Sequence, residues 1–405
     1  MRRTPLLLVV AALLGAACLG REPLLVPHGH AADDRSNAAA PAQPGAAGTL
    51  HGAKFEPPRG RILHGMGQFD EGNAGYLSLL DPGIQPASKL DFLPIGDWPR
   101  SWDNRLQVFR ASMKKLEENG RIPHIDIALY GLDPNTRKQV SVDLEVADTT
   151  RYDQHILELA QVIASHKGPV FLRIGGEFSG AWMDYHPYDY PRAYRKVVDI
   201  FRGAGADNVA FVWCYEPSAP DDFDVHDARG WKWFPGDDVI DWYGIDLFAP
   251  DQFARRASGR GSDDKLARSE KFLKMARDHK KPVMIGECSP SQEDITDDPE
   301  DGRRDWQSWF QPFLKFLDDH PEVEAFYFIN YDWRKSRSLD TNGWQDAEIQ
   351  KNPYIGPMWV KEMQKPRYLH LDDVKLLDGY AAACANRPEY AGPGPAEPSS
   401  APPGR

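Results

Sequence analysis

The feature that most constrains the fold is an alternation of short apolar runs with longer amphipathic stretches. Eight runs rich in β-branched and aromatic residues predict strands: 61–67, 89–96, 122–129, 169–176, 209–215, 239–248, 282–288 and 324–333. Such continuous apolar strands, separated by helices, are typical of a parallel sheet that helices cover on its faces.

Helix-like stretches lie between these runs, at 103–120, 151–168, 190–206, 263–280 and 303–320. In 263–280, for example, Leu266, Phe272, Leu273 and Met275 lie on one side of charged neighbours. Eight strand-and-helix units predict an α/β fold of the (β/α)8 TIM barrel type, as a single catalytic domain.

An open, doubly wound sheet is the main alternative. Its dinucleotide fingerprint is weak here, because Gly65 and Gly67 are followed by Asp70 and Glu71 instead of a third glycine. Their negative charge would repel a pyrophosphate.

The two flanks differ in composition from the middle of the chain. Residues 21–51 are predicted as a disordered linker, rich in Ala, Pro and Gly over 31–50, and 386–405 as a disordered Pro-rich tail. The barrel is therefore expected over 52–385.

Residues 1–20 read as an export signal, with Arg2 and Arg3 before an apolar stretch and small residues after it. The sequence before Cys18 loosely resembles a bacterial lipobox, so a lipid anchor at Cys18 is an alternative to cleavage. We expect an exported bacterial protein that is secreted, periplasmic or lipid-anchored.

Charge and cysteine content exclude several classes of partner. The formal net charge is −12, and no dense basic run follows the amino terminus, which argues against nucleic acid as a partner. The four cysteines form no CxxC pair, the chain has no HExxH, and the acidic loops 221–230 and 293–305 lack the pattern of a calcium loop. We expect no metal and no cofactor, and a monomer that binds a neutral or polar ligand.

Two glutamates end predicted strands on facing sides of the barrel. Glu177 follows the fourth strand and Glu287 ends the seventh, so both would project into the mouth where barrel enzymes place their catalytic groups. Two carboxyl groups across one site are what glycoside hydrolysis requires.

The stretch FLRIGGEFSGAW, at 171–182, resembles the acid/base segment of glycoside hydrolase family 26. Arg173, Glu177, Gly180 and Trp182 hold the matching positions, and 194–217, 233–248 and 281–289 resemble the family's later strands. The resemblance covers about 165–335. It implies that Glu177 is the acid/base and Glu287 the nucleophile of a retaining, double-displacement mechanism.

The chain departs from the family pattern at two positions. Gly176 stands where the family usually has histidine, and Phe248 where a tyrosine commonly contacts the nucleophile. Tyr243 or Tyr215 could supply the missing hydroxyl.

Five further residues are predicted to contact substrate or the catalytic carboxylates. Trp182, Trp213, Trp333 and Trp344 lie at or beyond strand ends, where aromatic faces can stack on sugar rings. Arg173 is expected to hold a catalytic carboxylate in its charged form.

The predicted function is a retaining glycosidase of the endo-β-mannanase type. Its partner would be a β-linked polysaccharide or oligosaccharide, with mannan favoured over xylan or mixed glucan. Two alternatives are a catalytically impaired carbohydrate-binding or scaffold protein, and an enzyme that trims the cell's own exopolysaccharide.

Overall fold

The computed structural model describes residues 48–133, 135–255, 264–336 and 344–385. The predicted export signal, Cys18 and the Pro-rich tail lie outside these residues. Within the described ranges, no helix combines the length and the apolar character needed to cross a membrane.

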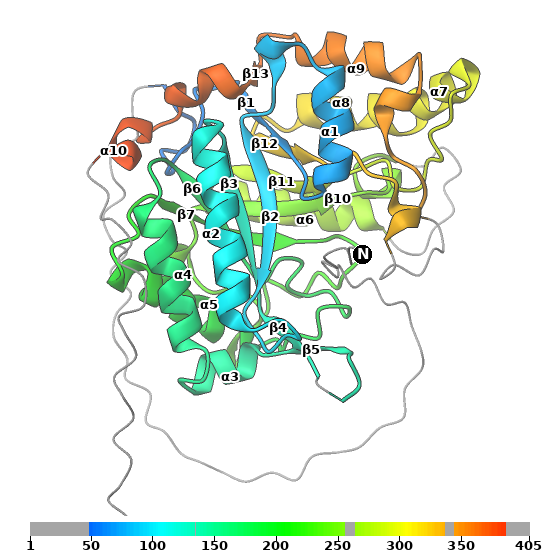
Figure 1. The fold of residues 1–405 in the computed structure, drawn as a ribbon. Helices are drawn as coiled ribbons and strands as arrows, with labels where there is room; N and C mark the ends of the chain where they lie inside the picture. Colours follow the sequence, from blue (N-terminus) through cyan, green and yellow to red (C-terminus); the bar gives the residue numbers. More distant parts are fainter. Residues whose placement is uncertain (1–47, 134, 256–263, 337–343, 386–405) are drawn as a thin grey trace, which may run out of the picture.

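Eight parallel strands form a closed barrel (Figure 1). Along the sheet their order is β12, β11, β10, β7, β6, β3, β2 and β1, and β12 also pairs with β1, which closes the ring. The strands are Ile62–Met66 (β1), Ser88–Pro94 (β2), Ile122–Ala128 (β3), Val170–Ile174 (β6), Val209–Tyr215 (β7), Trp242–Leu247 (β10), Val283–Cys288 (β11) and Val323–Phe328 (β12). The predicted (β/α)8 barrel is confirmed.

Helices lie between the strands and cover the outside of the barrel (Figure 1). They are Asp70–Leu79 (α1), Trp102–Glu118 (α2), Asp143–Asp148 (α3), Asp153–Ser165 (α4), Tyr190–Gly203 (α5), Lys265–Asp278 (α6), Pro299–Asp305 (α7), Gln311–Asp319 (α8), Ile355–Met363 (α9) and Tyr380–Cys384 (α10). A π-helical turn, Trp306–Phe310, joins α7 to α8, so the helix predicted at 303–320 is interrupted. Two hairpins, Tyr130–Leu132 (β4) with Gln139–Ser141 (β5) and His226–Asp227 (β8) with Gly230–Trp231 (β9), were not predicted.

Alternation along each strand decides which side chains enter the barrel. In β6, Val170, Leu172 and Ile174 pack outward against the helices, whereas Phe171 belongs to the interior cluster. Arg173 follows the interior register and is fully buried. An apolar strand thus carries one cation into the middle of the barrel.

The floor of the barrel, at the amino ends of its strands, is closed by the two ends of the described chain. Phe55 packs in the interior cluster with Leu377, and its backbone N–H donates to the Asp378 carbonyl at 3.2 Å. A short strand, Tyr368–Leu369 (β13), pairs with β1 next to this contact. The catalytic end predicted from the sequence is the opposite one.

Helix α1 packs against the loop that follows β12, and Gly72 is the residue of closest approach. A Cβ at Gly72 would lie 1.7 Å from the Asn330 carbonyl oxygen, whereas a Cβ at Gly83 would meet nothing within 4 Å. We expect Gly72→Ala to lower the free energy of unfolding by roughly 1–3 kcal/mol, because the backbones must move apart. Gly83→Ala is the matched control and should change it by less than about 0.5 kcal/mol. Urea denaturation of both variants measures the difference, and equal stabilities would contradict the packing argument.

Candidate active site

One buried guanidinium organises the upper half of the barrel. Arg173 on β6 donates to Asp126 on β3, to Asp246 Oδ2 on β10 at 2.8 Å, and to Glu287 on β11. Burial opposes its charge, but Asp246, Asp126 and Glu287 together raise the pKa of Arg173 well above its usual value. Arg173 was predicted to hold a catalytic carboxylate, and this geometry agrees with that role: of the two glutamates singled out in the sequence, Arg173 pairs with Glu287.

Three carboxyl groups around one guanidinium leave an excess of negative charge. Burial, and next the Glu287 charge, raise the pKa of Asp246 well above its ordinary range despite Arg173, and burial raises that of Asp126 to about 6. The Cys214 thiol also lies 3.3 Å from Asp246 Oδ1. Burial and the neighbouring carboxylates thus both disfavour a negative charge on Asp246, while Arg173 favours it.

Two glycines permit this close packing. A Cβ at position 176 would lie 2.4 Å from Asp126 Oδ2 and 2.6 Å from Arg173 Nε. A Cβ at position 286 would lie 2.8 Å from Asp246 Oδ1 and 3.1 Å from an Arg173 terminal nitrogen. Position 176 therefore has no space for the histidine of the family pattern, because the Asp126–Arg173 pair fills it.

Glu177 follows β6 in a backbone conformation that non-glycine residues rarely adopt. Its φ is +54°, and that of Gly175 is +57°. The half-buried carboxylate accepts a hydrogen bond from Trp182 Nε1 at 2.5 Å. Burial, followed by the negative charges of Asp246, Glu287 and Glu216, raises the pKa of Glu177 well above its usual value. A carboxyl group whose pKa is raised in this way is suited to act as a general acid.

Glu216 is a site carboxyl group that sequence reasoning missed. It directly follows β7 and is buried, and it accepts hydrogen bonds from the Gln252 side chain and, at 2.7 Å, from the Ser218 backbone N–H. Burial raises its pKa to about 7. Its position at a strand end is the same signal that identified Glu177 and Glu287.

An aromatic cluster lies beside Glu287, at the carboxyl end of the barrel. Trp333 donates from Nε1 to Ser289 Oγ at 3.0 Å, two residues after Glu287. The cluster contains Phe69, Phe248, Tyr331, Trp333 and Trp344. Trp333 is only 1% exposed, so it has no ring face open to a sugar, contrary to the prediction. Trp344 is half-buried and packs on Phe248 at a ring distance of 5.0 Å.

The structure brings Trp182 to the site but not Trp213. Trp213 points out of the barrel, is fully buried, and stacks on Phe178 at 4.5 Å in the layer under the helices. The prediction of a sugar contact for Trp213 is therefore wrong. Strand β7 is apolar on both faces, so its sequence did not indicate which residues point inward.

Tyr215 and Tyr243, suggested as replacements for the missing tyrosine, lie in the same outer layer as Trp213. The Tyr215 hydroxyl donates to the Ala219 carbonyl at 2.9 Å. Neither tyrosine contacts Glu287, whose hydrogen-bond donor is Arg173.

Comparison with curated proteins identifies two relatives in sequence. A β-1,3-xylanase of Vibrio sp is 30% identical over 266 residues, which are 60% of this chain and 54% of the relative. A β-1,3-xylanase of Alcaligenes sp is 29% identical over 255 residues, which are 57% of this chain and 50% of the relative. The chain thus spans about half the length of these relatives. No family model matches it.

Solved structures share the fold of the described barrel. A Cellulomonas fimi endo-β-1,4-mannanase double mutant superposes with a TM-score of 0.52 at 15% identity, covering 81% of this chain and 75% of that one. The catalytic domain of a family 26 endo-β-1,4-mannanase from Bacillus sp. JAMB-750 gives 0.51 at 16% identity, covering 77% and 88%. The class is thus a (β/α)8 barrel, and the resemblance to glycoside hydrolase family 26 is confirmed at the level of the fold.

The contacts of Gly176 generate a stability prediction. We expect Gly176→Ala to lower the free energy of unfolding by roughly 1–3 kcal/mol, because the added methyl group displaces Arg173 from Asp126. Gly203→Ala is the control, since a Cβ at the end of α5 meets no atom within 4 Å. Denaturant titrations compare the two. Full stability in the Gly176 variant would mean that the Asp126–Arg173 pair can move aside freely.

Proposed function

We propose that this protein is a retaining glycoside hydrolase that cleaves the interior of a β-linked polysaccharide by double displacement. The observation that carries the proposal is the pairing of Glu177 and Glu287 at the ends of β6 and β11. Glu287 is ion-paired to Arg173, while the charge of Glu287 helps to raise the pKa of Glu177. One carboxylate is thereby suited to attack and the other to give a proton.

In the first displacement, a Glu287 oxygen forms a bond to the anomeric carbon of the sugar. The glycosidic bond breaks, its electron pair stays on the leaving oxygen, and that oxygen takes the proton of Glu177. The ester formed on Glu287 is neutral, so one cause of the raised pKa of Glu177 disappears. Glu177 can then accept a proton from water as that water attacks the same carbon and releases Glu287.

We place β-1,3-xylan first among the substrates, ahead of the mannan that the sequence analysis favoured. Both curated relatives are β-1,3-xylanases, at 30% and 29% identity. The mannanases are 15–16% identical, a level that supports the fold alone. Mannan stays the second candidate because of the family resemblance at 171–182.

The impaired, sugar-binding alternative loses its main support. It rested on Gly176 and Phe248, yet Gly176 has a packing function beside Asp126 and Arg173. Phe248 lies in the aromatic cluster, and Glu287 keeps a charged hydrogen-bond donor without a tyrosine there. Export, with or without an anchor at Cys18, stays a prediction, as do the monomeric state and the trimming of the cell's own exopolysaccharide.

The function is tested by hydrolysis of β-1,3-xylan, β-mannan, β-1,4-xylan and lichenan. Wild type should release reducing sugar from one polymer with retained configuration, seen by proton NMR. Glu177→Gln should lower kcat/KM on the polymer about 10²- to 10⁴-fold, because the leaving oxygen needs a proton. A dinitrophenyl glycoside has a leaving group that needs no proton. On this substrate Glu177→Gln should still release a burst of dinitrophenolate as the glycosyl ester forms, and Glu287→Gln should release none. Glu300→Gln, on the exposed start of α7, is the control and should keep wild-type activity.

Two outcomes would contradict the proposal. One is a product of inverted configuration, and the other is a burst of dinitrophenolate in the Glu287 variant.

Glu216 generates a pH prediction. Activity requires protonated Glu177, so kcat/KM should fall as pH rises through its raised pKa. The negative charge of Glu216 is one cause of that raised pKa. Glu216→Gln removes this charge, which lowers the pKa of Glu177 and moves the falling limb of the pH profile to lower pH. The Glu300→Gln profile should match wild type. A limb that stays in place would mean that Glu216 does not act on Glu177.

A further inference from the structure

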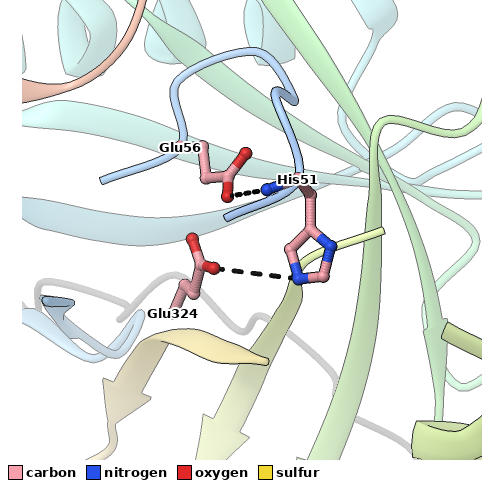
Figure 2. Close-up of side chains that lie close together, drawn as sticks. All are labelled: His51, Glu56 and Glu324. Atoms are coloured by element: carbon pink, nitrogen blue, oxygen red, sulfur yellow. Dashed lines mark hydrogen bonds and ion pairs between the residues drawn. The ribbon is translucent and has the colours of Figure 1, made fainter. Parts of the chain in front are cut away.

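Three potential ligands lie close together, as Figure 2 shows. They are at the floor of the barrel, the end opposite Glu177 and Glu287. His51 and Glu56 come from the segment before β1, and Glu324 is the second residue of β12. One ligand atom from each residue can be chosen so that all three lie within 4.8 Å of one another. Glu324 lies far along the chain from His51 and Glu56, so no local motif indicated the cluster.

Glu324 has no donor to satisfy its carboxyl group. Its side chain is 2% exposed, and neither oxygen has a hydrogen-bond partner among the described residues. His51 Nε2 is also without such a partner and lies 3.9 Å from Glu324 Oε1. A buried charged group with no partner is costly, and native structures rarely leave one without an ion or a proton.

Glu56 is held in place by its own loop. Its Oε1 accepts the backbone N–H groups of Leu50 at 2.7 Å and His51 at 2.6 Å, and its Oε2 accepts that of Ala53 at 2.8 Å. Each carboxylate oxygen has two lone pairs, so Oε2 keeps one acceptor position. Hydrogen bonds of this kind orient a ligand before a metal arrives.

We propose that His51, Glu56 and Glu324 bind one divalent transition-metal ion, Zn²⁺ by its donor set, which joins the segment before β1 to β12. One imidazole nitrogen and two carboxylate oxygens are ligands that zinc takes, with water in a fourth position. Tetrahedral zinc separates its ligand atoms by roughly 3.3–3.5 Å. The 3.9 Å between His51 Nε2 and Glu324 Oε1 is somewhat longer than this, and all three ligand atoms lie within 4.8 Å of one another, so the side chains would close in on a bound ion.

A proton shared between two carboxyl groups is the competing explanation. Burial, then the charge of Glu56, and then the hydrogen bond that a proton between the two side chains would make raise the pKa of Glu324 to about 10, with Arg59 opposing. Without a metal, Glu324 would thus hold a proton against Glu56. His51 has no role in the shared-proton explanation, whereas it is a ligand in the zinc proposal. Variants of His51 therefore distinguish the two explanations.

The test uses the full chain, freed of metal with EDTA and titrated with Zn²⁺ by calorimetry. Wild type should bind one zinc that His51→Gln and Glu324→Gln each weaken at least about tenfold. His226→Gln, an exposed histidine in β8, is the matched control and should bind as wild type does. Zinc should also raise the unfolding temperature of wild type and of the control, but not that of His51→Gln.

Zinc affinity and thermal stabilisation that are the same in wild type and His51→Gln would overturn the proposal, and so would the absence of zinc binding by wild type. His51 is part-exposed, so its variant should fold even if Glu324→Gln does not, and it decides the result alone in that case. Neither readout depends on hydrolysis, so failure of the proposed function would leave this test intact.

Discussion

The structure depends on placing one guanidinium among three carboxyl groups inside a barrel. Removing a single member of such a buried group leaves a charge without its partner, which typically costs about 3–5 kcal/mol. Arg173 therefore fixes its surroundings: Gly176 and Gly286 stay small beside it, and Asp126, Asp246 and Glu287 keep their strands in register around it. The same constraint that holds the barrel's upper half together also orients the carboxylate proposed as nucleophile.

The sequence was informative where a pattern has one physical meaning. All eight strands lie within the predicted runs or a few residues from them, because parallel strands buried on both faces are continuously apolar. Glu177 and Glu287 were predicted as a pair because acids at the carboxyl ends of barrel strands meet at one mouth. Apolarity on both faces is also why Trp213 was misplaced, since it does not tell inward from outward residues. Asp126 and Asp246, each the single acid of its strand, could be interpreted only when Arg173 was seen between them.

Gly176 illustrates a second limit of reading a chain against a family pattern. A missing side chain was interpreted as a lost contact, whereas the structure gives the position to another pair of residues. The interpretation could not be better from sequence alone, because the occupant, Asp126, comes from a strand far earlier in the chain. Departures from a pattern are thus best judged by what fills the space.

Both ends of the described chain lie on the same face of the barrel. The segment before β1 and the turns that follow β13 pack on each other at the floor, where the Phe55 N–H donates to the Asp378 carbonyl and the Asp378 N–H donates to the Glu56 carbonyl. The strand ends that carry Glu177 and Glu287 face the other way. The described barrel therefore has both of its ends on the face away from Glu177 and Glu287, and neither end lies between these two carboxyl groups.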